Sequence, residues 1–131
     1  MSSGSHEVRV YYEDTDHSGL VYHANYLRYF ERGREHLLGP DELVSMLNTS
    51  GVGFVVYKAN LQFKAGAKFG DVLDIRSTVG KASPWRLTFD QRAFRRGEDT
   101  PLVIGDIDLC CVDRDGKLVK VPQRVLDRLQ T

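Results

Sequence analysis

The chain has 131 residues, in which 18 lysine and arginine residues balance 18 aspartate and glutamate residues. A formal net charge of zero argues against broad electrostatic binding of nucleic acid or of an anionic membrane surface. No apolar run approaches the roughly 18 residues of a membrane-spanning helix, so we expect no integral membrane segment. The length is typical of one domain, and we expect residues 1–131 to form a single domain around one hydrophobic core.

The two cysteines, Cys110 and Cys111, are adjacent in the chain. Neighbouring residues of a strand point to opposite faces, so a disulfide between them is not expected. Reduced thiols are typical of the cytoplasm, where we expect the protein to act. The first five residues, MSSGS, are small and polar. We expect them to be disordered or left over from cloning, and we assign them no function.

The chain opens with a predicted strand and a loop. Residues 6–13, HEVRVYYE, alternate in a way that predicts a strand, with Val8, Val10 and Tyr12 on one face. Residues 14–19 contain aspartates, a threonine, a serine and a glycine, which are typical of a loop.

Two helices are predicted next. From Asn25 to Leu38, apolar residues recur at helical spacing over so much of the circumference that we expect a helix buried on more than one side. The pair Gly39-Pro40 interrupts this pattern. A short second helix is expected from Asp41, which can cap it, to Leu47.

Beyond residue 50 the apolar period changes to two, which predicts strands joined by tight turns. Alternation marks four stretches: residues 53–64, 71–81, 85–96 and 101–113. In the first of them, the apolar face would consist of Val55, Tyr57, Ala59, Leu61 and Phe63. A turn at residues 113–116 and a short tail with Pro122 complete the chain.

This order of elements predicts the α+β class, with one long helix laid on about five antiparallel strands. A single helix covers only one face of such a sheet. We therefore expect the other face, or an edge strand, to pair with a second subunit.

The loop before the long helix combines groups that could carry out chemistry. The N-terminus of a helix presents unpaired backbone N–H groups and a partial positive charge, which stabilise a developing oxyanion. Asp16 lies just before such an end, and the backbone N–H near His23 opens the helix. Together they could serve acyl transfer or hydrolysis, with Asp16 as nucleophile or general base.

Structural alternatives exist for each of these residues. Asp14, Thr15 and Asp16 are also typical of caps and turns, and His17 and His23 of polar loops. The aromatic residues of this segment suit a core first and a pocket lining second. A metal site built from Asp14, Asp16, His17 and His23 is not expected, because the spacings typical of histidine ligands are absent.

One block carries a longer pattern. An aspartate is followed after two variable residues by a glycine, a branched apolar pair, an aromatic residue, a histidine, and an asparagine and tyrosine that enter the helix. These positions are Asp16, Gly19, Leu20, Val21, Tyr22, His23, Asn25 and Tyr26. Residues 11–35, YYEDTDHSGLVYHANYLRYFERGRE, resemble the signature of hotdog-fold acyl-CoA thioesterases of the 4-hydroxybenzoyl-CoA type, including YbgC-like enzymes. Residues 53–75 are similar to the second and third strands of that family, so the resemblance spans about residues 7–113.

The resemblance implies a hotdog fold, in which a curved antiparallel sheet wraps a central helix, and homodimers or homotetramers with active sites between subunits. It implies that Asp16 is the catalytic carboxylate and that the backbone N–H of His23 polarises the thioester carbonyl. The side chains of Tyr22 and His23 would line or assist the site. The other substrate-binding positions of the motif would be Gly19, Val21, Asn25 and Tyr26. A histidine at position 23 favours a general acyl-CoA enzyme over the aromatic specialist.

The substrate would be an acyl-CoA and no separate cofactor would be needed, since coenzyme A is part of the substrate. By position, the resemblance makes Lys81, Ser83 and Arg86 candidates for holding the nucleotide, although a solvated turn explains them equally well. Further cations that could contribute instead are Lys58, Lys64, Arg95 and Arg96. A carboxylate within the helix, Glu31 or Glu35, is the alternative to Asp16.

Two other functions remain open. A hydratase of the same fold would alter the absorbance of an enoyl thioester without releasing thiol, and it would not need this aspartate and glycine block. A non-catalytic acyl-CoA or acyl-carrier binding protein would neither change this absorbance nor release thiol. An intact Asp16 argues for the enzyme.

Overall fold

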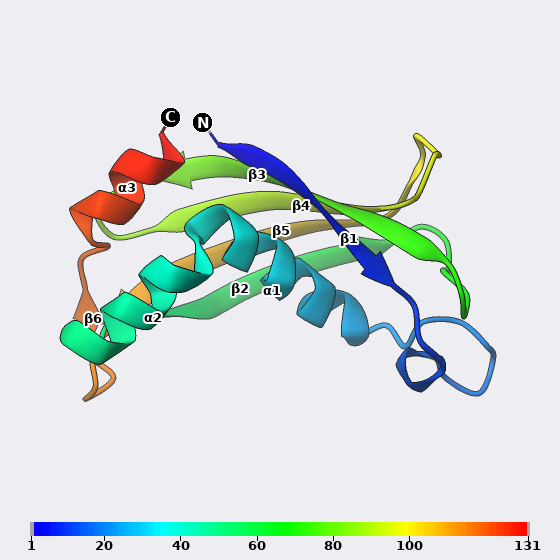
Figure 1. The fold of residues 1–131 in the computed structure, drawn as a ribbon, viewed down its shortest axis with the longest axis horizontal. Coiled ribbons are helices and arrows are strands. Elements are labelled where there is room, and N and C mark those ends of the chain that lie inside the picture. Colours follow the sequence, from blue (N-terminus) through cyan, green and yellow to red (C-terminus); the bar gives the residue numbers. More distant parts are fainter. Residues whose placement is uncertain (1, 131) are drawn as a thin grey trace.

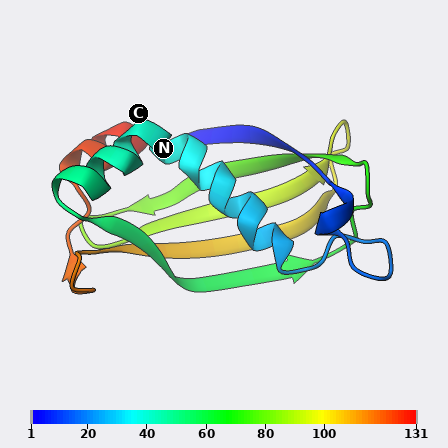
Figure 2. The same ribbon diagram turned by 60° about the horizontal axis from the view of Figure 1, so that its bottom comes forward.

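The computed structural model describes residues 2–130 and confirms the α+β class. In chain order its elements are β1 (Ser3–Arg9), the 3-10 turn η1 (Tyr12–Asp14), α1 (Asn25–Leu38), α2 (Pro40–Thr49), β2 (Gly53–Phe63), β3 (Val72–Ala82), β4 (Leu87–Arg95), β5 (Pro101–Val112), β6 (Leu118–Val119) and α3 (Gln123–Leu129). The strands form one antiparallel sheet in the order β1-β3-β4-β5-β2, and the short β6 pairs with β5. Helix α1 crosses one face of this sheet (Figures 1 and 2).

The N-terminal region differs from its prediction. Residues Ser3 to Ser5, expected to be disordered or a cloning remnant, belong to β1 and pair with Thr78 to Arg76 of β3. The strand ends at Arg9, and Tyr12 is 78% exposed in η1 instead of sharing a strand face with Val8 and Val10. The cause is local, because the Asp14 carboxylate accepts a hydrogen bond of 2.9 Å from the Tyr11 N–H and closes a turn there.

The predicted C-terminal tail is in fact a helix. Helix α3 begins after Pro122 and buries Val125, Leu126 and Leu129. It is seven residues long, so its apolar period is too short to be recognised without the surface that it covers. In β5, Cys110 and Cys111 are both free thiols, as expected, and burial raises the pKa of Cys111 to about 12.

Strand β2 departs from simple alternation because it contains a β-bulge. Val56 pairs with Leu109 and Lys58 with Asp108, which leaves Tyr57 as the extra residue. Val55 therefore does not share a face with Ala59 and Leu61 as predicted, since the bulge shifts the period by one residue. Beyond β5, no other strand of residues 2–130 pairs with β2, and its outer edge is free (Figure 2).

The close approach of α1 to the sheet depends on two glycines. A Cβ atom at Gly33 of α1 would lie 2.8 Å from the Ser77 Oγ and 3.1 Å from the Gln91 Nε2. A Cβ atom at Gly105 of β5 would lie 2.7 Å from the ring of Phe30. Interiors are packed so closely that added atoms at such positions force neighbours apart. The backbones of α1 and of the sheet therefore approach each other closely at these two glycines.

A buried polar cluster fixes the helix at this contact. The Gln91 side chain, fully buried, donates to the backbone O of Phe30 at 2.7 Å and to the Ser77 Oγ at 2.8 Å. Its amide oxygen accepts a hydrogen bond of 2.9 Å from Arg34 Nη1. A buried polar group is costly unless its bonds are made, so these residues hold α1 in one position on β3 and β4.

We predict that Gly33→Ala lowers the free energy of unfolding by about 1–3 kcal/mol, because the added methyl group overpacks the contact with Ser77 and Gln91. In an unconstrained helix the same change would stabilise by about 1 kcal/mol. Urea denaturation measures the difference, with the exposed Glu35→Ala as the control on the same helix. A Gly33→Ala protein more stable than wild type would contradict the close contact.

Candidate active site

The loop between η1 and α1 presents the Asp16 carboxylate in a defined conformation. Asp16 Oδ1 accepts hydrogen bonds from the N–H of Ser18, at 2.9 Å, and from the Ser18 hydroxyl. Gly19 completes this turn with a φ of +83°, a conformation that residues with a Cβ atom rarely adopt. The bonds from Ser18 favour the ionised form and lower the pKa of Asp16. The carboxylate is therefore charged throughout the neutral range.

Helix α1 begins with unused backbone donors. The first residues of the helix, Asn25 and Tyr26, donate to the carbonyls of Tyr22 and His23 at 2.8 and 3.4 Å. Within residues 2–130, no acceptor is found for the N–H groups of His23 or Ala24. Two free donors and the positive end of the helix dipole thus lie together, an arrangement that favours negative charge on a ligand atom.

Asp16 and His23 line the same depression in the surface, which we call the Asp16 hollow. Its volume is about 250 Å³, and it is lined by Asp16, Leu20, Val21, His23, Tyr26, Phe63, Lys64, Ala65 and Gly66. The rings of His23 and Tyr26 lie edge-on or tilted to Phe63, with centroids 6.1 and 5.9 Å apart. The hollow is thus an apolar and aromatic surface with one carboxylate and one cationic side chain, a composition typical of small-molecule sites.

The segment of residues 64–71, which contributes Lys64, Ala65 and Gly66 to the hollow, is held to the helix and to the loop. The Ala67 N–H donates to the Tyr26 hydroxyl at 3.3 Å, and the Ala67 carbonyl accepts from the Val21 N–H at 2.9 Å. Burial raises the pKa of Tyr26, so its hydroxyl stays protonated at neutral pH. The same segment therefore positions both the motif loop and the first turn of α1.

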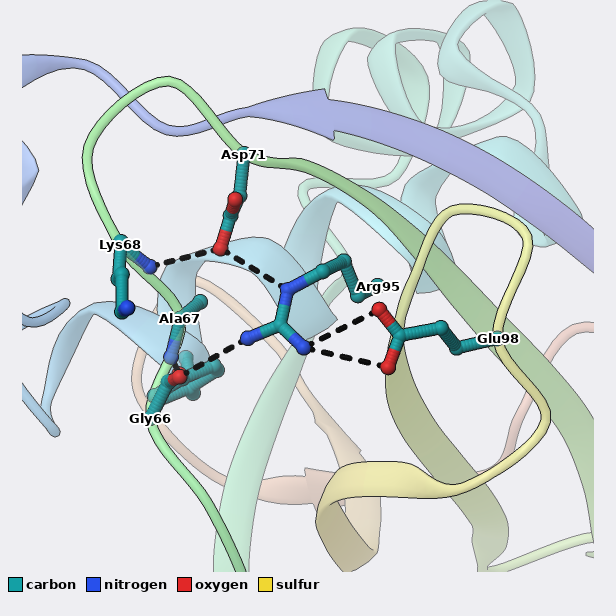
Figure 3. A network of polar contacts seen from close by, with 7 residues as sticks. Gly66, Ala67, Lys68, Asp71, Arg95 and Glu98 are labelled. Atoms are coloured by element: carbon teal, nitrogen blue, oxygen red, sulfur yellow. Dashed lines mark hydrogen bonds and ion pairs between the residues drawn. The ribbon is translucent and has the colours of Figure 1, made fainter.

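Arg95 supports this segment from the side of β4. Its guanidinium bonds to the Asp71 carboxylate, to the backbone O of Gly66 and to the Glu98 carboxylate, each at 3.2 Å (Figure 3). Asp71 in turn accepts from the Lys68 N–H at 2.9 Å (Figure 3). Arg95 thus holds the segment that contains Ala65 and Gly66, two residues that line the hollow.

The structure brings together only part of the predicted site. Asp16, Val21, His23 and Tyr26 line the Asp16 hollow. Three other motif residues have structural contacts nearby instead. Gly19 forms the turn, Tyr22 packs on the His23 ring at 4.5 Å, and the Asn25 side chain donates to the Asp14 carbonyl at 2.9 Å.

The predicted nucleotide-binding residues are not near Asp16 in the same chain. Lys81, Ser83 and Arg86 lie at the turn between β3 and β4, whereas the hollow borders the segment that precedes β3. Because β3 is eleven residues long, these two ends are about 30 Å apart. The resemblance to the family gave the positions of these residues in the sequence, but it did not give their distance from Asp16. The cation that does line the hollow is Lys64.

Sequence reasoning did not predict how the hollow is built. Phe63 and Gly66 line the hollow, but no local pattern sets them apart from an ordinary strand end or turn. The sequence suggests Arg95 only as a possible cation for the nucleotide, whereas in the structure it holds Gly66. The alternative carboxylates, Glu31 and Glu35, line a different pocket at the far end of α1. Among residues 2–130, no cluster of three or more potential metal-ligating side chains exists, and no helix is long and apolar enough to cross a membrane.

A central helix wrapped by an antiparallel sheet, with a carboxylate beside the helix N-terminus, defines a hotdog-fold protein of the thioesterase class. The chain belongs to the Thioesterase-like superfamily, whose family model matches residues 10–129. It is 37% identical over 107 residues to the acyl-CoA thioester hydrolase YbgC of Escherichia coli O6:H1, covering 81% of this chain and 79% of that protein. These findings confirm the predicted family and the prediction that the protein is a thioesterase enzyme.

Solved structures agree with this assignment. A probable thioesterase from Bartonella henselae is 28% identical and superimposes with a TM-score of 0.84, covering 92% of this chain and all of that one. A mutant 4-hydroxybenzoyl-CoA thioesterase in complex with 4-hydroxybenzoyl-CoA has a TM-score of 0.87 at 19% identity, covering 97% of this chain and 98% of that one. At that identity the likeness concerns the fold.

We predict that Ser18→Ala raises the pKa of Asp16, because one donor to the ionised carboxylate is lost. The wild-type carboxylate stays ionised to a pH below the ordinary range of an aspartate, and in the variant it should take up its proton at a higher pH. A carbon-13 NMR titration of the Asp16 carboxyl measures both midpoints, with Ser50→Ala as a distant control. An unchanged or lower midpoint in Ser18→Ala would contradict the assigned hydrogen bond.

We also predict that Arg95→Leu lowers the free energy of unfolding by about 1–3 kcal/mol, since it removes the cation beside the partly buried Asp71 carboxylate and the side-chain donor to the Gly66 carbonyl. Arg96→Leu is the matched control. Arg96 is exposed and its side chain forms a surface ion pair with Glu7 at 3.6 Å, so its loss should change stability by less than about 0.5 kcal/mol. Equal effects of the two substitutions in urea denaturation would contradict the supporting role of Arg95.

Proposed function

We propose that the protein hydrolyses the thioester of an acyl-CoA to the free acid and coenzyme A, with Asp16 as the catalytic carboxylate. The observation that carries the proposal is the shared hollow of Asp16 and the helix entrance, where the N–H groups of His23 and Ala24 have no acceptor within residues 2–130. YbgC of Escherichia coli, named an acyl-CoA thioester hydrolase, supports the choice of substrate.

The free N–H groups would receive the thioester carbonyl oxygen. Negative charge builds on that oxygen when the carbonyl carbon becomes tetrahedral, and donors fixed beforehand stabilise this charge without having to reorganise. Loss of one such donor from an enzyme of this kind typically costs about a hundredfold in rate. The His23 side chain lies beside the same point, where it can contact the leaving group.

Asp16 could attack the carbonyl carbon itself or deprotonate a water molecule that does so. In the first case the thiolate of coenzyme A leaves, and water then hydrolyses the acyl-aspartate anhydride and restores the carboxylate. A general base works best when its pKa is near the pH of the reaction, roughly 7. The lowered pKa of Asp16 makes it a weak base and keeps it ionised, and the ionised carboxylate is the form that both roles require.

The phosphates of coenzyme A require a cation near the hollow. Lys64 lines the hollow and is exposed, whereas Lys81, Ser83 and Arg86 of the same chain are distant, so we assign the first phosphate contact to Lys64. We further propose a homodimer that forms along the free edge of β2, and a cytoplasmic location. Two features of β2 support the dimer. Several of its apolar residues are exposed, and its long free edge would be prone to aggregation if it remained unpaired.

We predict that Asp16→Asn lowers turnover of acyl-CoA at least about a hundredfold, the scale typical of a lost acid, base or nucleophile. The measurement is release of free thiol from short-chain, long-chain and aromatic acyl-CoAs. Asp115→Asn, the same change in an exposed turn at the other end of the sheet, should keep wild-type turnover.

Three results would count against the proposal. No thiol release from any acyl-CoA would overturn the assigned function. A loss of enoyl absorbance without thiol release would indicate the hydratase. Equal turnover by wild type and Asp16→Asn would leave the enzyme class in place but remove Asp16 from the site.

A further inference from the structure

The loop that presents Asp16 is itself a small hairpin, formed by residues 14–22, which we call the Asp16 hairpin. The Asp16 N–H donates to the carbonyl of Leu20 at 2.8 Å, and Thr15 and Val21 form an isolated antiparallel bridge. Bonds between the two arms fix the register of such a hairpin. Asp16 therefore has a fixed position relative to the base of the hairpin.

The base of the Asp16 hairpin is tied to helix α1 through one oxygen atom. The Asp14 carbonyl accepts two hydrogen bonds of 2.9 Å, one from the Tyr22 N–H and one from the Asn25 side-chain amide. A carbonyl oxygen has two lone pairs, so these bonds use its full capacity. Since Asn25 is the first residue of α1, its amide joins the helix to the chain two residues before Asp16.

The backbone of Asn25 fixes the helix entrance from the other side. Its N–H donates to the Tyr22 carbonyl at 2.8 Å. The Tyr22 carbonyl and the His23 N–H belong to one peptide group, which is planar, so a bond that fixes the carbonyl also fixes the direction of that N–H. Asn25 thus contacts both the hairpin that carries Asp16 and the peptide group that presents the His23 N–H.

The Asn25 side chain is not placed to bind substrate or to start the helix. Asn25 is not among the residues that line the Asp16 hollow, and its amide nitrogen is engaged by Asp14. The N-cap position of α1 is held by Ala24, whose side chain cannot accept a hydrogen bond. The amide of Asn25 therefore stabilises the position of the hairpin relative to the helix, and not the helix itself.

We infer that Asn25 is a positioning residue of the proposed reaction. Through the Asp14 carbonyl, its amide holds the Asp16 carboxylate in line with the free N–H groups at the start of α1. A thioester carbonyl bound by those donors must also meet the carboxylate, or a water molecule that it activates, at its carbon atom. A displacement of about 1 Å in such an arrangement can cost about a hundredfold in rate. The inference rests on the proposed function, and it replaces the substrate-binding role that the family resemblance implies for Asn25.

The first test removes the donor. Asn25→Asp keeps the shape of the side chain but places a carboxylate, which cannot donate, against the Asp14 carbonyl. Asn25→Ala removes the donor without adding charge. Both variants should lower kcat at least about tenfold and change KM less than about threefold, because the hollow stays intact and only the alignment in the transition state is lost.

The measurement is thiol release from butanoyl-CoA, dodecanoyl-CoA and benzoyl-CoA, with full kinetics for the one that wild type cleaves fastest. Asn48→Asp, the same change at an exposed position of α2, is the matched control and should keep wild-type kinetics. A raised KM with an unchanged kcat would assign Asn25 to substrate binding and overturn the inference. Equal effects of Asn25→Asp and Asn48→Asp would also overturn it.

The second test distinguishes alignment from general damage. It introduces Asn25→Ala both into wild type and into Asp16→Asn. If Asn25 acts by aligning the Asp16 carboxylate, little remains to be aligned once that carboxylate is lost. The double variant should then turn over less than about threefold more slowly than Asp16→Asn alone. Damage unrelated to Asp16 would multiply the two losses, and that result would overturn the inference.

The outcome for the proposed function is read separately. Thiol release by wild type that is lost in Asp16→Asn supports the proposed function whatever the Asn25 variants do. In such an active enzyme, a wild-type kcat in both Asn25 variants would overturn the positioning role alone. No thiol release by wild type from any of the three substrates would overturn both.

Discussion

The contact between helix α1 and the sheet is the constraint on which the rest of the structure depends. Gly33 and Gly105 allow the two backbones to approach closely, and the buried amide of Gln91 locks the helix in place through the Phe30 carbonyl and Ser77. A helix fixed so closely has its first turn fixed as well. The free N–H groups at its entrance are therefore held beside the motif loop by packing some ten residues further along the chain.

The site is built partly from residues close to Asp16 in the sequence and partly from residues far from it. Asp16 and Ser18 set the charge of the carboxylate within a single turn. The facing wall comes from the segment before β3, which Tyr26 contacts and Arg95 closes. Electrostatics is thus controlled by the loop itself, whereas the shape of the hollow depends on residues far away in sequence. Substitutions in the two groups affect different properties of the site.

Much of the fold was predictable because its signals are local. The bounds of α1 follow from its apolar period and from Gly39-Pro40, and the adjacency of Asp16 and His23 follows from a few residues of chain. The β-bulge at Tyr57 was not predictable, because it depends on pairing with β5. The same holds for α3, which is defined by the surface that it covers, and for the distance between Asp16 and Lys81, which depends on the direction of β3.

The burial of Cys111 has a chemical consequence for an enzyme of this class. Cleavage of a thioester releases a thiol, and the disulfide form of such a thiol exchanges with any accessible protein thiolate. With a pKa of about 12, Cys111 remains protonated at neutral pH and is shielded within β5, so it does not take part in that exchange. Cys111 is therefore inert toward mixed disulfides with the oxidised form of the thiol that thioester cleavage releases.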